Sequence, residues 1–410
     1  MNLVTVSAAS IRIGQPLPFS LWGADGTLLA QKGFVVESRE VLEDIVARGV
    51  TLFIDIAESE SHHRAYVDKL YTMVLEDRPL GQIAQTGMSQ KELDNLRTEA
   101  PDGPPDWLDF QVQANALLRD SNPAHFLGRL NRFQSQLRQY SHGNPDGALF
   151  ALIHLSASEL QLYSATHAML VSVMCGIAAR EVLNWPPELE ATLCKAALCM
   201  NIGMTELQDR LAFQITRPSP EQRELIDQHA SLSARMLEQF GVADPSWLEA
   251  VRDHHARAPG PLSRKTEGQR LARLIQRADM FAARLAPRTS RAPTTPAAAM
   301  QATYFDEDRQ IDEAGAALIK AVGIYSPGSF VRLNTHEIAV VIRRGANTTT
   351  PRVAVVVNRD GMPTSEHVIR DTSHGDYRIV ASVAHRDVKV QLNLERFLPL
   401  TSAPAADQPW

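Results

Sequence analysis

The segment ATHAMLVSVMCGIAA, residues 165–179, places apolar side chains at three- and four-residue spacing, which predicts a buried helix. Its inner stripe includes Leu170, Met174 and Ile177, and His167 continues that stripe. A histidine at a buried position needs a partner, because burying an unpaired polar group costs about 1–3 kcal/mol. The segment therefore predicts an α-helical domain with polar chemistry inside its core.

Neighbouring segments repeat this pattern. The predicted helix 221–240 carries His229 on its apolar stripe, and the predicted helix 268–285 carries Asp279 on its inner side. His254 and His255 end a shorter predicted helix. Inward histidines and a carboxylate on four helices of one bundle are the donor types that bind zinc, iron or manganese. A structural bundle in which these residues form buried hydrogen-bonded pairs is the alternative interpretation.

Changes of hydrophobic period predict a mainly α protein with small β-units at both ends of the chain. The central helical period gives way to a period of two after Gly328. We expect a small β-rich N-terminal domain at 1–57, a helical connector at 58–145 with a polar proline-rich linker near 97–107, a helical domain at 146–327, a C-terminal β-unit at 328–400 and a disordered tail at 401–410.

Composition restricts the classes of partner. The net charge of -6 over 410 residues argues against a DNA-binding surface. No apolar run approaches the roughly 20 residues that span a bilayer, and no signal peptide is recognisable, so we expect a cytoplasmic protein without membrane insertion. Cys175, Cys194 and Cys199 lie in apolar helical segments and are expected to be buried thiols.

The order and spacing of the polar residues resemble the HD-GYP branch of the HD-domain phosphohydrolases over about residues 150 to 345. The family pattern contains an early His, a segment ending in HDxGK, a single His, an HHE motif, a GYP loop, a late Asp and a closing YPPG-like turn. The matching positions here are, in order, His167, KAALCMNIGM (195–204), His229, His254 with His255, Asp279 and YSPGSFVRL (325–333). The resemblance implies a central HD-type helical bundle and a metal-dependent cyclic-di-GMP phosphodiesterase ancestry.

Four departures from the family pattern fall on its chemical positions. Met200 and Asn201 stand where the family has its defining His-Asp pair, Met204 stands where it has lysine, and Ala256 stands where it has the glutamate of HHE. The GYP loop is reduced to a segment around Pro259 to Pro261. In the family the aspartate bridges two metals, whereas an amide is a poorer ligand than a carboxylate. The resemblance therefore implies a degenerate catalytic centre.

The surviving residues divide between the two metal positions that the resemblance implies. His167 and Asp279 belong to the position that has lost most of its ligands, whereas His229, His254 and His255 belong to the other. Three imidazoles suffice for one ion, so we expect at most one transition metal, iron, manganese or zinc. The resemblance also implies ligand-binding arginines, for which the candidates are Arg288 and Arg291 in a proline-broken loop.

The sequence leaves three functional hypotheses open. The first is a regulatory, nucleotide-sensing or protein-interaction module in bacterial cyclic-di-GMP-type signalling, without catalysis. The second is a metal-dependent phosphodiesterase or phosphohydrolase with a remodelled mononuclear site. The third is the purely structural bundle. A cyclic dinucleotide or signalling proteins are the expected partners, and a homodimer is compatible with the sequence.

Overall fold

The computed structural model describes residues 3–6, 17, 21–23, 28–30, 34, 36, 38–49, 52–55, 105–120, 122–158, 162–285, 294–364, 366 and 368–402. Several sequence predictions fall outside these residues. They are the start of the helical connector after residue 57, most of the linker near 97–107, Arg288, Arg291 and the tail from 403. The chain divides into two compact units, residues 1–113 and 114–410, which are described separately.

The first unit contains a small antiparallel sheet. Its strands are β1 (Leu3–Val6), β2 (Leu21–Trp22), β3 (Leu28–Ala30) and β4 (Leu52–Asp55), in the order β1-β4-β2-β3. Helix α1 (Arg39–Gly49) begins where the Ser38 hydroxyl accepts a hydrogen bond from the Val41 amide, as the N-cap pattern predicts. The last helix of this unit, α5 (Trp107–Leu118), continues into the second unit.

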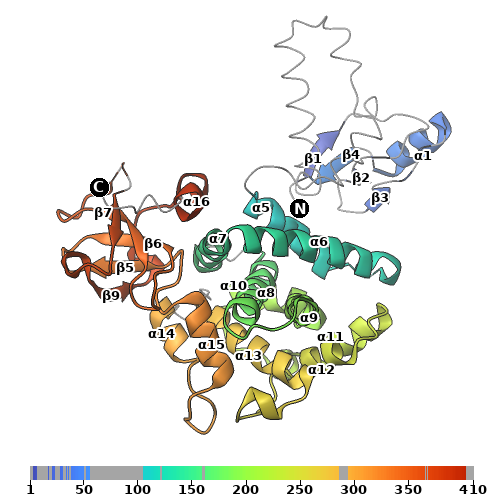
Figure 1. Ribbon diagram of the computed structural model, residues 1–410. Helices are drawn as coiled ribbons and strands as arrows, with labels where there is room; N and C mark the ends of the chain where they lie inside the picture. Colours follow the sequence, from blue (N-terminus) through green and yellow to red (C-terminus); the bar gives the residue numbers. More distant parts are fainter. Residues whose placement is uncertain are drawn as a thin grey trace, which may run out of the picture. The chain divides into compact units, whose positions relative to one another are not determined.

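The second unit is built around helix α8, which is buried from Tyr163 to Ala179. The helices are α6 (Pro123–Gly143), α7 (Pro145–Ser158), α8 (Tyr163–Glu181), α9 (Pro187–Cys199), α10 (Thr205–Phe213), α11 (Pro220–Gln239), α12 (Pro245–Asp253), α13 (Glu267–Leu285), α14 (Pro296–Gln301) and α15 (Glu313–Val322). Helices α7, α9, α13 and α15 contact α8 (Figure 1). The predicted mainly α fold is confirmed.

Local capping signals place the helices that carry the polar residues. Ser219 and Gln222 form a capping box at the start of α11. The carboxylate of Asp244 accepts amide hydrogen bonds at the start of α12, and that of Asp312 does so for α15. Each of these caps satisfies backbone donors that the helix itself leaves unpaired. Among the described residues, no helix is both long and apolar enough to cross a membrane.

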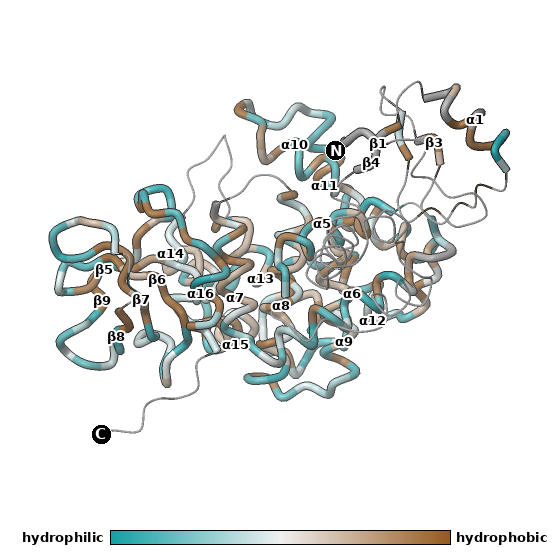
Figure 2. Tube along the Cα trace, turned by 90° about the horizontal axis from the view of Figure 1, so that it is seen from above, coloured by the Kyte–Doolittle hydropathy of each residue, from teal (hydrophilic) through white to brown (hydrophobic). Residues whose placement is uncertain are grey.

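The C-terminal part of this unit is a five-stranded antiparallel sheet followed by helix α16 (Leu394–Ser402). The strands β5 (Phe330–Leu333), β6 (Ile338–Arg343), β7 (Arg352–Val357), β8 (Ile369–Asp371) and β9 (Ile379–Val383) are ordered β8-β7-β6-β5-β9. Figure 2 shows β6 and β7 as hydrophobic segments, whereas the outer loops are mostly hydrophilic. All five strands lie after Gly328, where the sequence has a hydrophobic period of two, whereas helix α16 was not predicted there.

One face of this sheet packs on the helical domain. Phe150 of α7 shares a buried cluster with Phe330, Val340 and Phe397. The turn before β5 reaches α7 closely, because a Cβ added at Gly328 would lie 2.6 Å from the Phe150 carbonyl oxygen, and Gly328 also has a φ of 85°. Only glycine tolerates both conditions, which explains its place in the segment YSPGS.

Candidate metal centre

Three histidines meet where α11 and α12 pack together. His229 lies in the middle of α11, while His254 follows the last residue of α12 and His255 lies in the turn beyond it. The Nε2 atom of His229 lies 3.2 Å from that of His254 and 3.3 Å from that of His255. Two nitrogens bound at 2.0–2.1 Å to a tetrahedral zinc ion lie about 3.3 Å apart, so the spacing fits a shared ion.

Hydrogen bonds at the opposite ring nitrogens fix the orientation of two of these rings. The Nδ1 atom of His229 donates to the Ile226 carbonyl, and Nδ1 of His254 donates to the Val251 carbonyl at 2.6 Å. A neutral imidazole has only one N–H group, so both Nε2 atoms carry lone pairs. Two lone pairs facing each other repel, whereas a metal ion between them would satisfy both.

Burial keeps these rings neutral. Burial, reinforced by nearby His255, lowers the pKa of His254 to about 3, and burial also lowers the pKa of His229. A neutral imidazole is the form that binds a metal, so neither ring has to lose a proton at neutral pH. The donor set therefore fits one transition metal ion.

His255 differs from its prediction. The sequence pattern placed it among the inward residues, but it is exposed. The physical reason is that α12 ends at Asp253, so His255 lies in a turn and does not follow the helical face. The three histidines consequently have one side open to solvent, which leaves coordination positions for another ligand.

His167 and Asp279 form a separate, closed pair. The Nε2 atom of His167 lies 2.7 Å from Oδ1 of Asp279, and His167 is 3% exposed. Burial alone would raise the pKa of the Asp279 carboxyl, but the hydrogen bond and the charge of His167 hold this pKa well below its usual range. Burial lowers the pKa values of His229 and His254, and the Asp279 charge offsets part of this lowering, so the pair lies within electrostatic reach of these histidines.

The positions of the expected His-Asp motif lie at the end of α9. Met200 is fully buried, whereas Asn201 begins the short 3-10 helix η2 (Ile202–Met204). Gly203 of η2 donates its amide hydrogen to the Ser233 hydroxyl of α11, one helical turn after His229. The Oδ1 atom of Asn201 is buried, and no donor among the described residues reaches it. This amide oxygen is the one group of the motif positions with unused ligand capacity.

The turn that carries His255 is supported by residues that the sequence pattern did not predict. The Nε2 atom of Gln276 donates to the Ala256 carbonyl at 3.1 Å, and its Oε1 accepts from buried Arg273 at 2.6 Å. Lys265 donates to the carbonyls of Ala258 and Pro259 at 2.7 and 2.9 Å. The segment around Pro259, which the sequence predicted to correspond to a GYP loop, is therefore held by side chains. A signal existed for Gln276, because it precedes Asp279 by three residues on α13.

A buried charge network completes this support. Arg273 and Arg277 of α13 are almost fully buried and pair with Asp312 and Glu307. The paired guanidinium groups hold the pKa of Glu307 at about 2, chiefly through the Arg273 hydrogen bond. Buried charges are stable only when they are paired in this way. The network keeps α13, and with it Gln276 and Asp279, in a fixed position.

Two known proteins are similar to this chain, one in sequence and one in fold comparison. No protein-family model matches the chain. A cyclic di-GMP phosphodiesterase of Pseudomonas aeruginosa is 26% identical over 228 residues, which cover 54% of this chain and 54% of that protein. The chain thus matches about half the length of this curated relative. A solved structure titled an HDG"Y"P protein from Bdellovibrio bacteriovorus is 14% identical, with a TM-score of 0.40, and the match covers 77% of this chain and 98% of that one.

The match to the Pseudomonas aeruginosa phosphodiesterase agrees with the resemblance to the HD-GYP phosphohydrolases that the sequence predicted. Because the match covers about half of that relative, the activity of this chain has to be argued from its own residues. His229, His254 and His255 are brought together, His167 and Asp279 pair with each other, and Met200 is part of the core.

Proposed function

We propose that this chain is a catalytically degenerate HD-GYP-like module that acts by binding in cyclic-di-GMP-type signalling. Its ligand is a cyclic dinucleotide or a signalling protein. The observation that carries the proposal is the combination of a three-histidine cluster with a fully buried methionine at a motif position. One half of a two-metal centre keeps its ligands, and the other half has been replaced by packing.

Several missing groups argue against turnover. Met200 offers a buried thioether in place of an imidazole, and a thioether suits iron, manganese or zinc dications poorly. Met204 carries no charge for a phosphate, and Ala256 has no carboxylate. Two-metal phosphodiester hydrolysis needs both ions to stabilise the attacking and leaving oxygens. Without a bridging carboxylate the second ion has no adequate shell.

The three-histidine cluster limits which metal ion the chain would bind. His229, His254 and His255 would bind one iron, manganese or zinc ion, and the exposed side at His255 would admit a ligand from solvent. Such an ion would act as a Lewis acid toward a phosphoryl or carboxylate oxygen. In the binding module this interaction contributes affinity for an anionic ligand or partner.

A second candidate function is a mononuclear metal-dependent phosphodiesterase. It is favoured by the buried Oδ1 of Asn201, which no donor among the described residues reaches, and by the Asp279 carboxylate near the histidines. In that case Asn201 would supply an additional oxygen ligand. Asp279 is a weak candidate for proton transfer, because its hydrogen bond with His167 keeps its pKa low.

Paired measurements of cyclic-di-GMP binding and turnover test the proposal. The protein is loaded with iron, manganese or zinc, binding is followed by calorimetry, and products are followed by chromatography. We expect binding without turnover, weakened by His255→Ala but not by His374→Ala, a control at an exposed histidine (70% side-chain exposure). Linear dinucleotide or GMP formed over many turnovers, and lost in His255→Ala, would establish the phosphodiesterase instead. Absence of both binding and turnover would exclude a cyclic-di-GMP sensor.

A further inference from the structure

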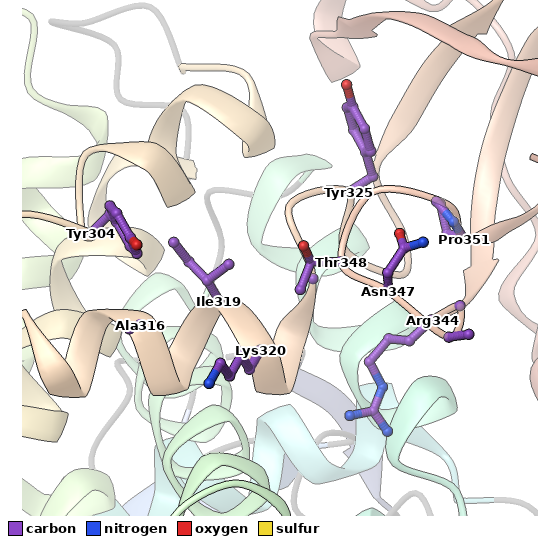
Figure 3. A pocket seen from close by; sticks show the side chains of 12 residues that line it. Tyr304, Ala316, Ile319, Lys320, Tyr325, Arg344, Asn347, Thr348 and Pro351 are labelled. Atoms are coloured by element: carbon purple, nitrogen blue, oxygen red, sulfur yellow. The ribbon is translucent and has the colours of Figure 1, made fainter. Parts of the chain in front are cut away.

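A cavity of about 500 Å³ lies between the C-terminal half of α15 and the loop that joins β6 to β7. This volume falls within the range of small-molecule sites, about 300–1,000 Å³. Figure 3 shows Ile319 and Lys320 of α15 on one wall and Asn347 and Thr348 of the loop on the other. All lining residues lie in the described part of the chain, and none belongs to the histidine cluster.

The loop wall is held in shape by its own hydrogen bonds. The Oδ1 atom of Asn347 accepts from the Thr349 amide and from the hydroxyls of Thr349 and Thr350, each at 2.9 Å. The Thr348 carbonyl accepts from the Ile324 amide at 2.9 Å. A Cβ at Gly345 would lie 1.9 Å from the Thr350 carbonyl oxygen, so this tight path requires glycine. A preformed wall lowers the entropy cost of binding.

The charge of the cavity favours an anion. Its charged lining residues are Lys320 and Arg344, and no acidic side chain lines it. Arg344 is already engaged, because it contacts Asp146 at 2.7 Å and Glu181 at 2.8 Å. Lys320 is exposed, and no described carboxylate forms an ion pair with it. The ammonium of Lys320 is therefore available to a ligand.

The apolar lining adds a second requirement. Tyr304 and Tyr325 stand on opposite sides of Ile319 in Figure 3, with Ala316 and Pro351 completing the apolar surface. Tyrosine faces stack on planar rings, while the hydroxyl groups accept or donate hydrogen bonds. A bare inorganic anion would leave this surface unused. We infer that the cavity is a second binding site, for a small aromatic anion, with Lys320 contacting its charge and the tyrosines its ring.

Binding of phenyl phosphate tests this inference against two partial probes. Inorganic phosphate carries the charge alone, and phenol carries the ring alone. Affinities are measured by ligand-observed NMR on the full chain after chelation, so that no metal ion contributes. We expect phenyl phosphate to bind more tightly than either probe. If inorganic phosphate binds as tightly as phenyl phosphate, the cavity is only a non-specific anion contact. If phenol binds as tightly as phenyl phosphate, the charge of Lys320 does not contribute. Either result overturns the inference.

Variants locate the site. Lys320→Met keeps the apolar stem and should weaken phenyl phosphate binding up to about fivefold, because an exposed ion pair contributes up to about 1 kcal/mol. Lys389→Met, at an exposed lysine outside the cavity, is the matched control and should change nothing. Ala316→Phe fills the cavity and should abolish binding while thermal unfolding confirms the fold. Unchanged affinity in Lys320→Met, or loss of binding in His255→Ala, would refute this location.

Discussion

The two polar clusters of the helical domain differ in whether their groups are satisfied. His167 and Asp279 complete each other through one hydrogen bond of 2.7 Å. In the other cluster, His229 and His254 face each other with Nε2 lone pairs, because their Nδ1 atoms already donate to backbone carbonyls, and His255 lies beside them. The polar groups of the first cluster satisfy each other, whereas those of the second would be satisfied by a bound metal ion. Polar residues from one predicted site can therefore separate into a closed hydrogen-bonded pair and a set of candidate metal ligands.

Removing one histidine from each cluster gives the largest expected difference. His229→Ala should reduce bound metal from about one ion per chain to almost none, because two imidazoles do not retain an ion tightly. His167→Ala should leave the metal content near one ion. Elemental analysis of purified protein measures both, with His374→Ala as the surface control. Two ions in the unmodified chain would contradict the division into a ligand set and a structural pair.

Rebuilding the motif should erase the difference between the clusters. The double variant Met200→His with Asn201→Asp restores an imidazole and a bridging carboxylate, so metal content should rise toward two per chain. Burying polar groups in place of Met200 should cost about 1–3 kcal/mol of stability without metal. Elemental analysis and chemical denaturation with and without chelator report both effects. A variant that folds and still binds one ion would show that the second position has lost more than these ligands.

The supporting hydrogen bond of Gln276 should have a smaller effect. Gln276→Glu keeps an acceptor for Arg273 but loses the donor to the Ala256 carbonyl, so the turn that carries His255 loses one support. Metal affinity should fall about tenfold, which is typical of residues that orient ligands. Competition with a chelator measures the affinity, and Gln301→Glu, at an exposed glutamine, serves as control. Equal affinities in both variants would mean that Gln276 does not position the site.

Acid should weaken the junction of the β-sheet and the helical domain. Burial, followed by the charge of His154, lowers the pKa of His385 from 6.5 to about 4. Below pH 6.5 the unfolded chain binds a proton that the folded chain excludes, so stability falls as pH drops toward 4. The slope is at most about 1.4 kcal/mol per pH unit for one histidine. Urea unfolding at several pH values measures it. His385→Leu should make the slope smaller but not zero, because burial also lowers the pKa of His154 to about 4 and that of His254 to about 3. A slope identical to that of His374→Leu would reject this assignment.

The helical period of the sequence predicted most of the fold and part of the candidate site. The stripes around His167 and His229 identified α8 and α11, because side chains three and four residues apart share a face. Periodicity could not follow His255, which lies beyond the end of its helix. Periodicity places Gln276 on the same face of α13 as Asp279, but it could not identify the contacts of Gln276 with Ala256 or of Arg273 with Asp312, because these partners are distant in sequence. The helix α16 was missed because a segment containing Pro399 gives too little pattern.

The contact of Phe150 with the C-terminal sheet bears on how this chain could be shortened or recombined. The change of hydrophobic period after Gly328 suggests a domain boundary there. However, Phe150 of α7 stacks on Phe397 of α16, with ring centroids 5.9 Å apart. A graft of the helical domain alone would take half of that core and expose an aromatic side chain to water. Helical domain and sheet would therefore be inherited, transplanted or deleted together, and an expression fragment should extend through Ser402.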